Sequence, residues 1–299
     1  MSRERAFIAR LAAIARDPAA RGLADDAAVL PRGDGLLVAT HDMLVESVHF
    51  LANDPPADIA WKLVAVNLSD LAAKGAEPLG VLLGYPLAPD AAWDMAFADG
   101  LADVLDRVGV PLLGGDTVAV PTGSARQFGL TALGRADHAP ARSGAQAGDI
   151  LYVTGRIGAA GLGLAMARDG APGRPEWLDA YRRPTPRLAE GHLLAPVAHA
   201  MADVSDGLLI DTARMAAASG LAAEIDADAV PVAGGDRIAA LSAGDDYELL
   251  VAGPAALTLA PGLAPLAPIG RFRAGQGLVL LRDGRPLPLP ARLGYEHGA

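Results

Sequence analysis

Residues 36–50 read LLVATHDMLVESVHF, a stretch that predicts a buried β-strand with an aspartate, Asp42, at its centre. Its apolar and β-branched residues alternate roughly with a period of two, as in a strand that packs on a core. Strand interiors disfavour aspartate, and a buried carboxylate costs free energy unless a cation or a hydrogen-bond donor pairs with it. Only an edge strand with an exposed face would otherwise accommodate Asp42. Asp42 is therefore a candidate functional residue.

Strands and helices alternate on both sides of this stretch. Residues 55–78 predict a helix with prolines near its start and a glycine and a proline near its end. Residues 89–108 predict a helix with an apolar stripe at spacings of three and four, and residues 110–117 predict a short strand that runs into a glycine turn. We expect a helix at residues 1–20 and strands at residues 25–30, 79–87 and 126–135. These elements predict a first α/β unit that ends near residue 138.

A second α/β unit is expected after a connection at residues 139–148, which are rich in glycine and other small residues. The polar, proline-rich residues 171–186 predict an exposed loop. We expect strands at residues 149–155, 201–206, 221–226, 247–253, 268–272 and 277–284, and helices at residues 158–170, up to His199, and at residues 206–220. The sequence thus predicts two α/β domains, residues 1–138 and 139–299.

Composition excludes several classes of function. The 25 basic and 35 acidic residues give a net charge of -10, which provides no electrostatic footprint for nucleic acid. There is no cysteine, so disulfides, thiolate metal sites and iron–sulfur clusters are excluded. No apolar run approaches the roughly 18 residues of a membrane span, and no signal peptide is recognisable. We expect a cytoplasmic protein that binds neither nucleic acid nor membrane.

Aspartates lie at the ends or in the middles of apolar segments. Asp206 could cap the helix that follows it, Asp116 could close a turn, and Asp70 belongs to a polar stripe with Asn67 and Lys74 that faces either solvent or a site. The whole set is Asp25, Asp26, Asp42, Asp70, Asp116, Asp203, Asp206, Asp245 and Asp246. Together they favour a hard cation such as Mg²⁺, which prefers oxygen ligands and is usually held by carboxylates together with substrate phosphates. The six histidines show no close pairing, which argues against zinc.

Eight motifs in order along the chain resemble one family, the thiamine-monophosphate kinases of the aminoimidazole-ribonucleotide-synthetase-like superfamily. They are GLADDAAVL, HDMLVESVHF, AVNLSDLAAKGAEP, LLGGDT, ARSGAQAGDILYVTG, DVSDGLLIDTARM, AGDDYELL and the terminal GYEH. The resemblance implies ATP-dependent phosphorylation of thiamine monophosphate to thiamine diphosphate, the last step of thiamine diphosphate biosynthesis. It implies direct in-line transfer assisted by several Mg²⁺ ions, without a general base.

The resemblance also implies a fold and a set of site residues. The fold is a two-domain α/β (α+β) synthetase-like fold, with an N-terminal sheet that pairs across a homodimer and a C-terminal domain with a mixed sheet. The implied metal ligands are Asp26, Thr40, Asp42, Asp70, Asp116, Asp203 and Asp206. The implied nucleotide contacts are Gly115, Asp116, Arg142 and Ser205, and the implied contacts to the thiamine substrate are His49, Asp245 and Tyr295.

The chain departs from the family pattern at four positions. Ala24 and Ser47 stand where the family usually has Gly, His41 stands where it has Ser or Thr, and Asp245 stands where it has Glu. Asp245 shortens a substrate-facing carboxylate, and His41 can offer a metal only its backbone carbonyl. Selenophosphate synthetases and a related hydrogenase-maturation protein would carry a reactive cysteine, which this chain lacks. A non-catalytic, metal-stabilised dimer that binds thiamine phosphates or nucleotides is the alternative from another functional class.

Overall fold

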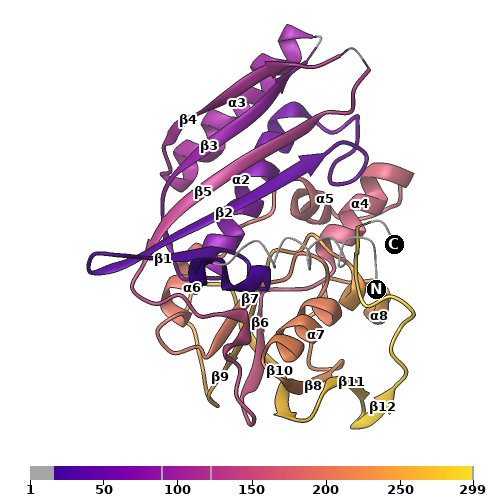
Figure 1. Cartoon of the computed structure of the whole chain (residues 1–299). Helices are drawn as coiled ribbons and strands as arrows, with labels where there is room; N and C mark the ends of the chain where they lie inside the picture. Colours follow the sequence, from indigo (N-terminus) through magenta and orange to yellow (C-terminus); the bar gives the residue numbers. More distant parts are fainter. Residues whose placement is uncertain (1–16, 89, 122, 298–299) are drawn as a thin grey trace.

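Two mixed β-sheets, each covered by helices, form the computed structural model, which describes residues 17–88, 90–121 and 123–297 (Figure 1). The helix expected at residues 1–20 lies largely outside the described residues. A separate apolar core lies against each sheet, and a third cluster packs Ala72 and Ala73 of the first unit against Tyr152, Met201 and Leu249 of the second unit. Among the described residues, no helix is both long and apolar enough to cross a bilayer.

The first sheet has five strands in the order β1-β2-β5-β3-β4. Its strands are β1 (Ala28–Arg32), β2 (Gly35–Val45), β3 (Glu77–Leu87), β4 (Leu112–Ala119) and β5 (Gln127–Ala136), all antiparallel to their neighbours except the parallel pair β3 and β4. Helices α2 (Pro56–Ala72) and α3 (Ala91–Val108) belong to this unit. Strand β1 pairs with β2 only at residues 35–39, so at Asp42, which pairs with Leu130 of β5, β2 is an edge strand within one chain. The face that carries Asp42 is half-buried rather than exposed, so an edge position alone does not account for the carboxylate.

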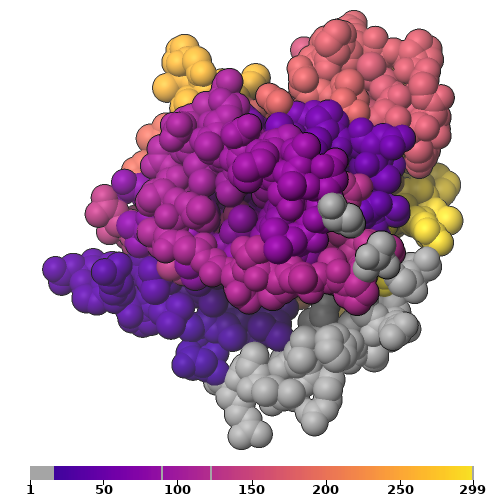
Figure 2. All heavy atoms as spheres, turned by 90° about the horizontal axis from the view of Figure 1, so that it is seen from above, coloured from indigo at the N-terminus to yellow at the C-terminus, as the bar shows by residue number. Residues whose placement is uncertain are grey.

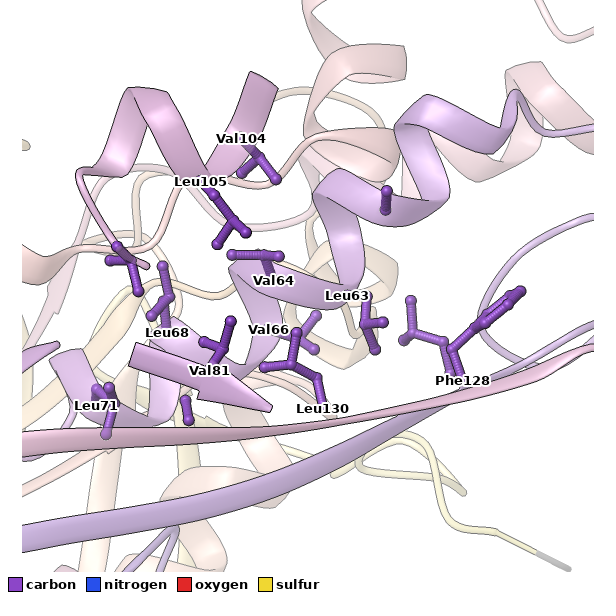
Figure 3. Packing of buried hydrophobic residues seen from close by; sticks show 14 of the residues in the cluster. Leu63, Val64, Val66, Leu68, Leu71, Val81, Val104, Leu105, Phe128 and Leu130 are labelled. Carbon is purple, nitrogen blue, oxygen red and sulfur yellow. The ribbon is translucent and has the colours of Figure 1, made fainter. Parts of the chain in front are cut away.

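Helix α2 is buried around almost its whole circumference. Its apolar residues pack against the first sheet and α3, as the close view of Figure 3 shows for Leu63 and Leu68 near Val81 and Leu130. The opposite side meets α5, α6 and β7 of the second unit. Polar side chains on α2 are therefore buried as well, and the stripe that carries Asp70 faces the protein interior rather than solvent. Such burial requires partners for each polar group.

The second sheet has seven strands in the order β12-β11-β8-β10-β6-β9-β7 and is mixed, because β8 and β11 run parallel. Its strands are β6 (Ile150–Thr154), β7 (Ala200–Asp203), β8 (Leu221–Asp226), β9 (Leu249–Gly253), β10 (Leu266–Ala274), β11 (Gly277–Arg282) and β12 (Arg285–Leu287). Its helices are α4 (Ala159–Asp169), α5 (Pro175–Arg182), α6 (Leu188–Leu194), α7 (Leu208–Ala218) and α8 (Arg237–Ser242). The α/β class and the mixed second sheet expected from the sequence are confirmed.

Three sequence predictions of local structure are wrong. Residues 171–186 contain helix α5, because Pro175 occupies a first-turn position that proline tolerates and Tyr181 is buried. The expected turn at residues 114–116 is part of strand β4. Gly115 in this strand has φ 155°, and a Cβ atom at this position would lie 2.0 Å from the Leu83 carbonyl oxygen, so a larger residue would not fit. The helix expected to reach His199 ends at Leu194.

Helix α5 docks on the first unit. Arg182 and Tyr181 both bond to Asp54, and Arg183 Nε lies 2.5 Å from Asp58 Oδ1. In the space-filling view from above, the salmon segment that carries α4 and α5 lies against the indigo segment at the start of α2 (Figure 2). The two units are thus joined on both sides of α2, which brings segments of both units to one site.

Candidate active site

Three buried aspartates from distant parts of the chain form a carboxylate cluster. Asp26 precedes β1, Asp70 lies in the last turns of α2, and Asp203 ends β7; one carboxylate oxygen from each lies within 4.8 Å of the other two. Asp70 is 8% exposed and Asp203 3%. The Thr40 hydroxyl donates to Asp70, and the Ser69 hydroxyl donates to Asp203 Oδ2 at 2.6 Å. The structure therefore brings predicted metal ligands from both units together.

Burial and mutual repulsion govern the charge of this cluster. Burial raises the pKa of Asp70 and of Asp203 well above the usual range, and neighbouring carboxylates raise both further. Burial also raises the pKa of Asp42 to about 6; His41 opposes this, whereas Asp26 and Asp206 add to it. Carboxylates crowded in this way accept a cation readily, because the cation removes the repulsion that burial magnifies.

Asp26 differs from its neighbours because two cations already contact it. Burial raises the pKa of Asp26, but Arg142 and Lys74 outweigh burial, and the net pKa is lowered. Lys74 is fully buried, and its Nζ lies 2.8 Å from Asp26 Oδ2 and 2.6 Å from Asp25 Oδ1. Arg142, the predicted nucleotide contact, pairs with Asp26. Asp26 is thus held in place at the edge of the cluster, next to a guanidinium suited to phosphate.

The donor set fits magnesium. The three aspartates of the cluster offer carboxylate oxygens, and Thr40 and Ser69 beside them offer hydroxyl oxygens, the hard ligand type that Mg²⁺ prefers. The raised pKa values of Asp42, Asp70 and Asp203 show that these carboxylates lack sufficient positive charge of their own. A divalent cation would supply that charge, so the residues fit the ion that the sequence predicts.

Without divalent metal, the protein is expected to lose stability as pH rises from about 4 through about 6. Asp42 has an ordinary pKa of 3.8 and a folded pKa of about 6, so the folded state binds more protons than the unfolded state in that window. Stability is then fully present below the ordinary pKa and is lost as pH passes the folded value. Asp70 and Asp203 act in the same direction, and Asp26 acts against them.

Thermal unfolding midpoints measured across this pH range, with chelator or with Mg²⁺, test that expectation. Mg²⁺ should reduce the slope, since bound metal replaces the protons. Asp42→Asn should reduce the slope in chelator. A stability of the chelated protein that only rises with pH would contradict the carboxylate repulsion described above.

A pocket of about 640 Å³ adjoins these acids. Six of the predicted site residues line it: Asp42, His49, Ser205, Asp206, Asp245 and Tyr295. They come from β2 and the loop after it, the segment between β7 and α7, the loop before β9, and the C-terminal segment. Both units therefore contribute walls to one pocket. Its apolar walls include Leu44, Val66 and Leu164, which suit an organic ring rather than a phosphate.

The His49 imidazole is oriented by a backbone N–H group at the end of β2. The Val45 N–H donates to His49 Nδ1 at 3.0 Å, so the neutral imidazole carries its proton on Nε2. Burial lowers the pKa of His49 and favours this neutral form. His297 lies near it, with ring centroids 5.4 Å apart, and contacts Tyr295 edge-on at 4.8 Å. The three rings form one aromatic side of the pocket.

Asp206 does not cap the following helix. Helix α7 begins at Leu208 after Gly207, and no side chain caps it; Asp211 in its first turn accepts at Oδ2 from the N–H groups of Asp206 and Gly207. The Asp206 carboxylate pairs with Arg214 and lines the pocket. The capping interpretation is wrong, and the side chain faces the site instead.

Gly115 and Asp116 are not brought to the cluster within one chain. They lie on β4, which is exposed along its whole length, and β4 is separated from β2 by β3 and β5. Three strand spacings correspond to roughly 14 Å. Asp116 aligns through Gly84 and Gly129 with Met43, so its side chain lies on the sheet face opposite to that of Asp42.

His41 also lies on this outer face. Its Nδ1 is 2.9 Å from the Thr131 hydroxyl oxygen on β5, and its side chain is exposed. Its imidazole is therefore directed away from Asp70, whereas the side chains of Thr40 and Asp42 on the same strand lie on the inner face. The histidine that stands in place of the family's hydroxyl residue therefore contributes no side-chain ligand to the buried cluster.

Sequence reasoning missed four residues around the pocket and the cluster: Lys62, Ser69, Tyr247 and His297. Ser69 and Tyr247 bond to Asp203 and Asp245, respectively, and His297 lines the pocket. Lys62 is one of two lysines in the chain and lies among the apolar residues of α2, a signal that could have indicated a buried partner. His297 belongs to the terminal GYEH motif.

The two mixed α/β units coincide with two domains of one class of protein, the AIR synthase related proteins. Residues 24–136 match the family model "AIR synthase related protein, N-terminal domain", and residues 146–285 match "AIR synthase related protein, C-terminal domain". The chain is 40% identical to a thiamine-monophosphate kinase of Caulobacter vibrioides, over 94% of this chain and 86% of that protein. The chain belongs to the thiamine-monophosphate kinase family and is an enzyme.

Solved structures agree with this assignment. The crystal structure of thiamine-monophosphate kinase from Stenotrophomonas maltophilia K279a is similar with a TM-score of 0.77 and 38% identity, covering 93% of this chain and 95% of that chain. The structure "AaThiL complexed with AMPPCP and TMP" is similar with a TM-score of 0.84 and 25% identity, covering 97% and 96%. The family resemblance inferred from the eight motifs is confirmed.

Proposed function

We propose that this chain transfers the γ-phosphoryl group of ATP to thiamine monophosphate, giving thiamine diphosphate, as the last step of thiamine diphosphate biosynthesis. The observation that carries the proposal is the pocket: the predicted substrate residues His49, Asp245 and Tyr295 line one cavity, and Asp42 connects that cavity to the carboxylate cluster. A relative bound to TMP and AMPPCP, an ATP analogue, supports the pairing of these two substrates.

The roles proposed for the site residues follow their positions. Asp26, Asp42, Asp70 and Asp203 would hold magnesium, with Thr40 and Asp206 beside them, and Asp116 would join from β4. The bound ions would shield the repulsion between two anionic phosphates and align them for in-line transfer. Thr40 and Ser69 orient the carboxylates by donating hydrogen bonds. Arg142 would donate charge-assisted bonds to the nucleotide, alongside Gly115 and Ser205.

No residue acts as general base in this proposal. The nucleophile is a phosphate oxygen of thiamine monophosphate, which is ionised near neutral pH, and the bond that breaks joins the γ-phosphorus to the oxygen that leaves with ADP. His49 is neutral with its proton on Nε2 and serves as a hydrogen-bond donor to the substrate. Tyr295 and His297 provide ring surface for the aromatic part of the substrate.

A homodimer completes the proposal. The outer face of the first sheet exposes Met43 and Leu82, and the adjoining strand β4 exposes Leu112, Leu113 and Val118. Contiguous apolar surface on a sheet face is typical of an interface. A second copy packed on this face would cover β4 and would give Gly115 and Asp116 a route to the partner's site. We also propose the domain division at residues 138 and 139, which the two separate sheets and cores support.

Incubation of the purified protein with ATP, Mg²⁺ and thiamine monophosphate tests the function directly. Thiamine diphosphate should accumulate and be detected by chromatography, and ADP should form in equal amount. Thiamine without its phosphate is the matched control and should give no product, because it lacks the ionised phosphate oxygen, and its un-ionised alcohol would need a general base. Binding of thiamine monophosphate without any product would favour the non-catalytic alternative and refute the proposal.

A further inference from the structure

Lys62 is a buried lysine whose ammonium group lies behind the pocket wall. Its side chain extends from α2 and is 2% exposed. Its Nζ donates to the His49 carbonyl oxygen at 2.9 Å and to Asp245 Oδ2 at 2.7 Å, and lies 4.4 Å from the centroid of the Tyr181 ring. His49 and Asp245 both line the pocket. One cation thus touches two pocket residues that belong to different units of the fold.

Asp245 is constrained from several directions. Its backbone has φ 67°, in the left-handed region that non-glycine residues seldom adopt. Lys62 holds one carboxylate oxygen, and the Tyr247 hydroxyl donates to the other, Oδ1, at 3.0 Å. The side chain remains 27% exposed, so it still presents an edge to the pocket. A short carboxylate held in this way has a defined direction, which a free aspartate on a loop would lack.

A purely structural role for Lys62 explains less of this geometry. A buried ion pair is weak evidence for stability, because the desolvation of both charges offsets much of their attraction. The second bond of Lys62, to the His49 carbonyl, holds the segment after β2 whose imidazole faces the pocket. The contact with Tyr181 joins the same ammonium to α5, which Asp54 also holds through the Tyr181 hydroxyl. These contacts converge on the pocket wall rather than on a core.

We infer that Lys62 is a positioning residue that sets affinity for the organic end of the substrate, by holding the Asp245 carboxylate and the His49 segment in their binding positions. The inference rests on the proposed function. The ammonium group of Lys62 bonds to the His49 carbonyl and to Asp245, neither of which belongs to the carboxylate cluster. Its effect is therefore confined to substrate binding and leaves the phosphoryl-transfer step intact. Preorganisation of this kind raises affinity by lowering the cost of ordering the site.

Lys62→Met tests the inference. The Kd of thiamine monophosphate, measured by calorimetry without ATP, should rise by at least about tenfold, as loss of a buried charge-assisted bond implies. The KM for thiamine monophosphate should rise in parallel, whereas kcat at saturating substrate and the KM for ATP should stay within about twofold. Arg107→Met is the matched control. Arg107 on α3 packs its guanidinium against the ring of Trp61, which neighbours Lys62 on α2 and does not line the pocket, so its loss should change none of these values.

Asp245→Asn provides the second arm. It removes the same ion pair from its more exposed side, so it should raise the Kd of thiamine monophosphate even if Lys62→Met does not fold. When both variants fold, the Kd of the double variant for thiamine monophosphate should be about equal to the higher Kd of the two single variants, because the two residues act as one unit. An unchanged Kd in Asp245→Asn, or in folded Lys62→Met, would overturn the inference. Failure of the wild-type protein to form thiamine diphosphate while it binds thiamine monophosphate would refute the function alone.

Discussion

Asp70→Asn is expected to reduce turnover on the order of a thousandfold and, at the same time, to stabilise the metal-free protein. The loss of turnover follows from the place of Asp70 at the centre of the cluster, within 4.8 Å of Asp26 and Asp203 oxygens. An amide offers no negative charge to a divalent cation, although its oxygen can still accept the hydrogen bond from Thr40. Metal-dependent steps should therefore fail while the local geometry remains.

The gain in stability arises because the substitution removes a buried carboxyl group that neighbouring carboxylates repel. Burial and then Asp42, Asp203 and Asp26 raise the pKa of Asp70 well above the usual range. Near pH 8, without metal, that carboxyl group costs folding free energy whether it is protonated or ionised, and asparagine removes the cost. The melting temperature should rise by about 2–4 °C for each kcal/mol recovered. Site residues commonly trade stability for function in this way.

Melting curves in chelator and turnover with Mg²⁺ measure the two effects on the same preparation. Asp103→Asn is the matched control, because Asp103 is an exposed aspartate in a surface pair with Arg107 and should change neither quantity. Normal turnover in Asp70→Asn would remove the cluster from the mechanism. A fall in the melting temperature of the chelated variant would show that the repulsion inferred from burial is compensated elsewhere.

Co-expression of two inactive variants, Asp42→Asn and Asp116→Asn, is expected to restore about a quarter of wild-type activity. Each variant alone should be nearly inactive. If Asp116 serves the partner's site, a mixed dimer has one site with both substitutions and one site with neither. Random assembly makes about half of the dimers mixed, and each mixed dimer has one intact site of two. The structure motivates this test because Asp116 lies three strands from β2 and on the opposite sheet face from Asp42.

Asp42→Asn co-expressed with Asp70→Asn serves as the control for this experiment. Both residues lie on the inner side of the same unit, Asp42 on β2 and Asp70 on α2, so every mixed dimer keeps one lesion in each site and no activity should return. Recovery in the control would indicate that chains exchange whole domains. No recovery in the Asp42→Asn and Asp116→Asn mixture would show that Asp116 acts within its own chain or not at all.

The elements with strong periodic patterns were predictable from the sequence. The strand around Asp42 and the two helices of the first unit occur as β2, α2 and α3, although β2 ends at Val45 rather than at residue 50, and α2 ends at Ala72 rather than at residue 78. Helix α5 was missed because its proline and polar residues resemble a loop, whereas contacts with Asp54 and Asp58 of the first unit stabilise it. Strand β4 was cut short at its glycines, which extend the strand beside β3 instead of turning.

The candidate site was predictable in its chemistry and less so in its geometry. The aspartate-rich turns indicated a hard cation, and the family motifs indicated His49, Asp245 and Tyr295, which the structure brings to one pocket. Lys62 was not identified: a lysine among the apolar residues of α2 can signal a buried partner, but the sequence does not reveal which residue that partner is when it lies 183 residues away along the chain.

The sequence by itself determined the α/β alternation, the family and the oxygen-rich chemistry of the site, since periodicity, motif order and residue type are local properties. Tertiary structure decided which acids meet: it placed Asp26, Asp70 and Asp203 together and left Asp116 on the far side of the first sheet. It also decided which cation fixes Asp245. The physical reason is that α2 is buried between two sheets that are formed by separate parts of the chain, so its polar side chains find their partners only when the two units pack.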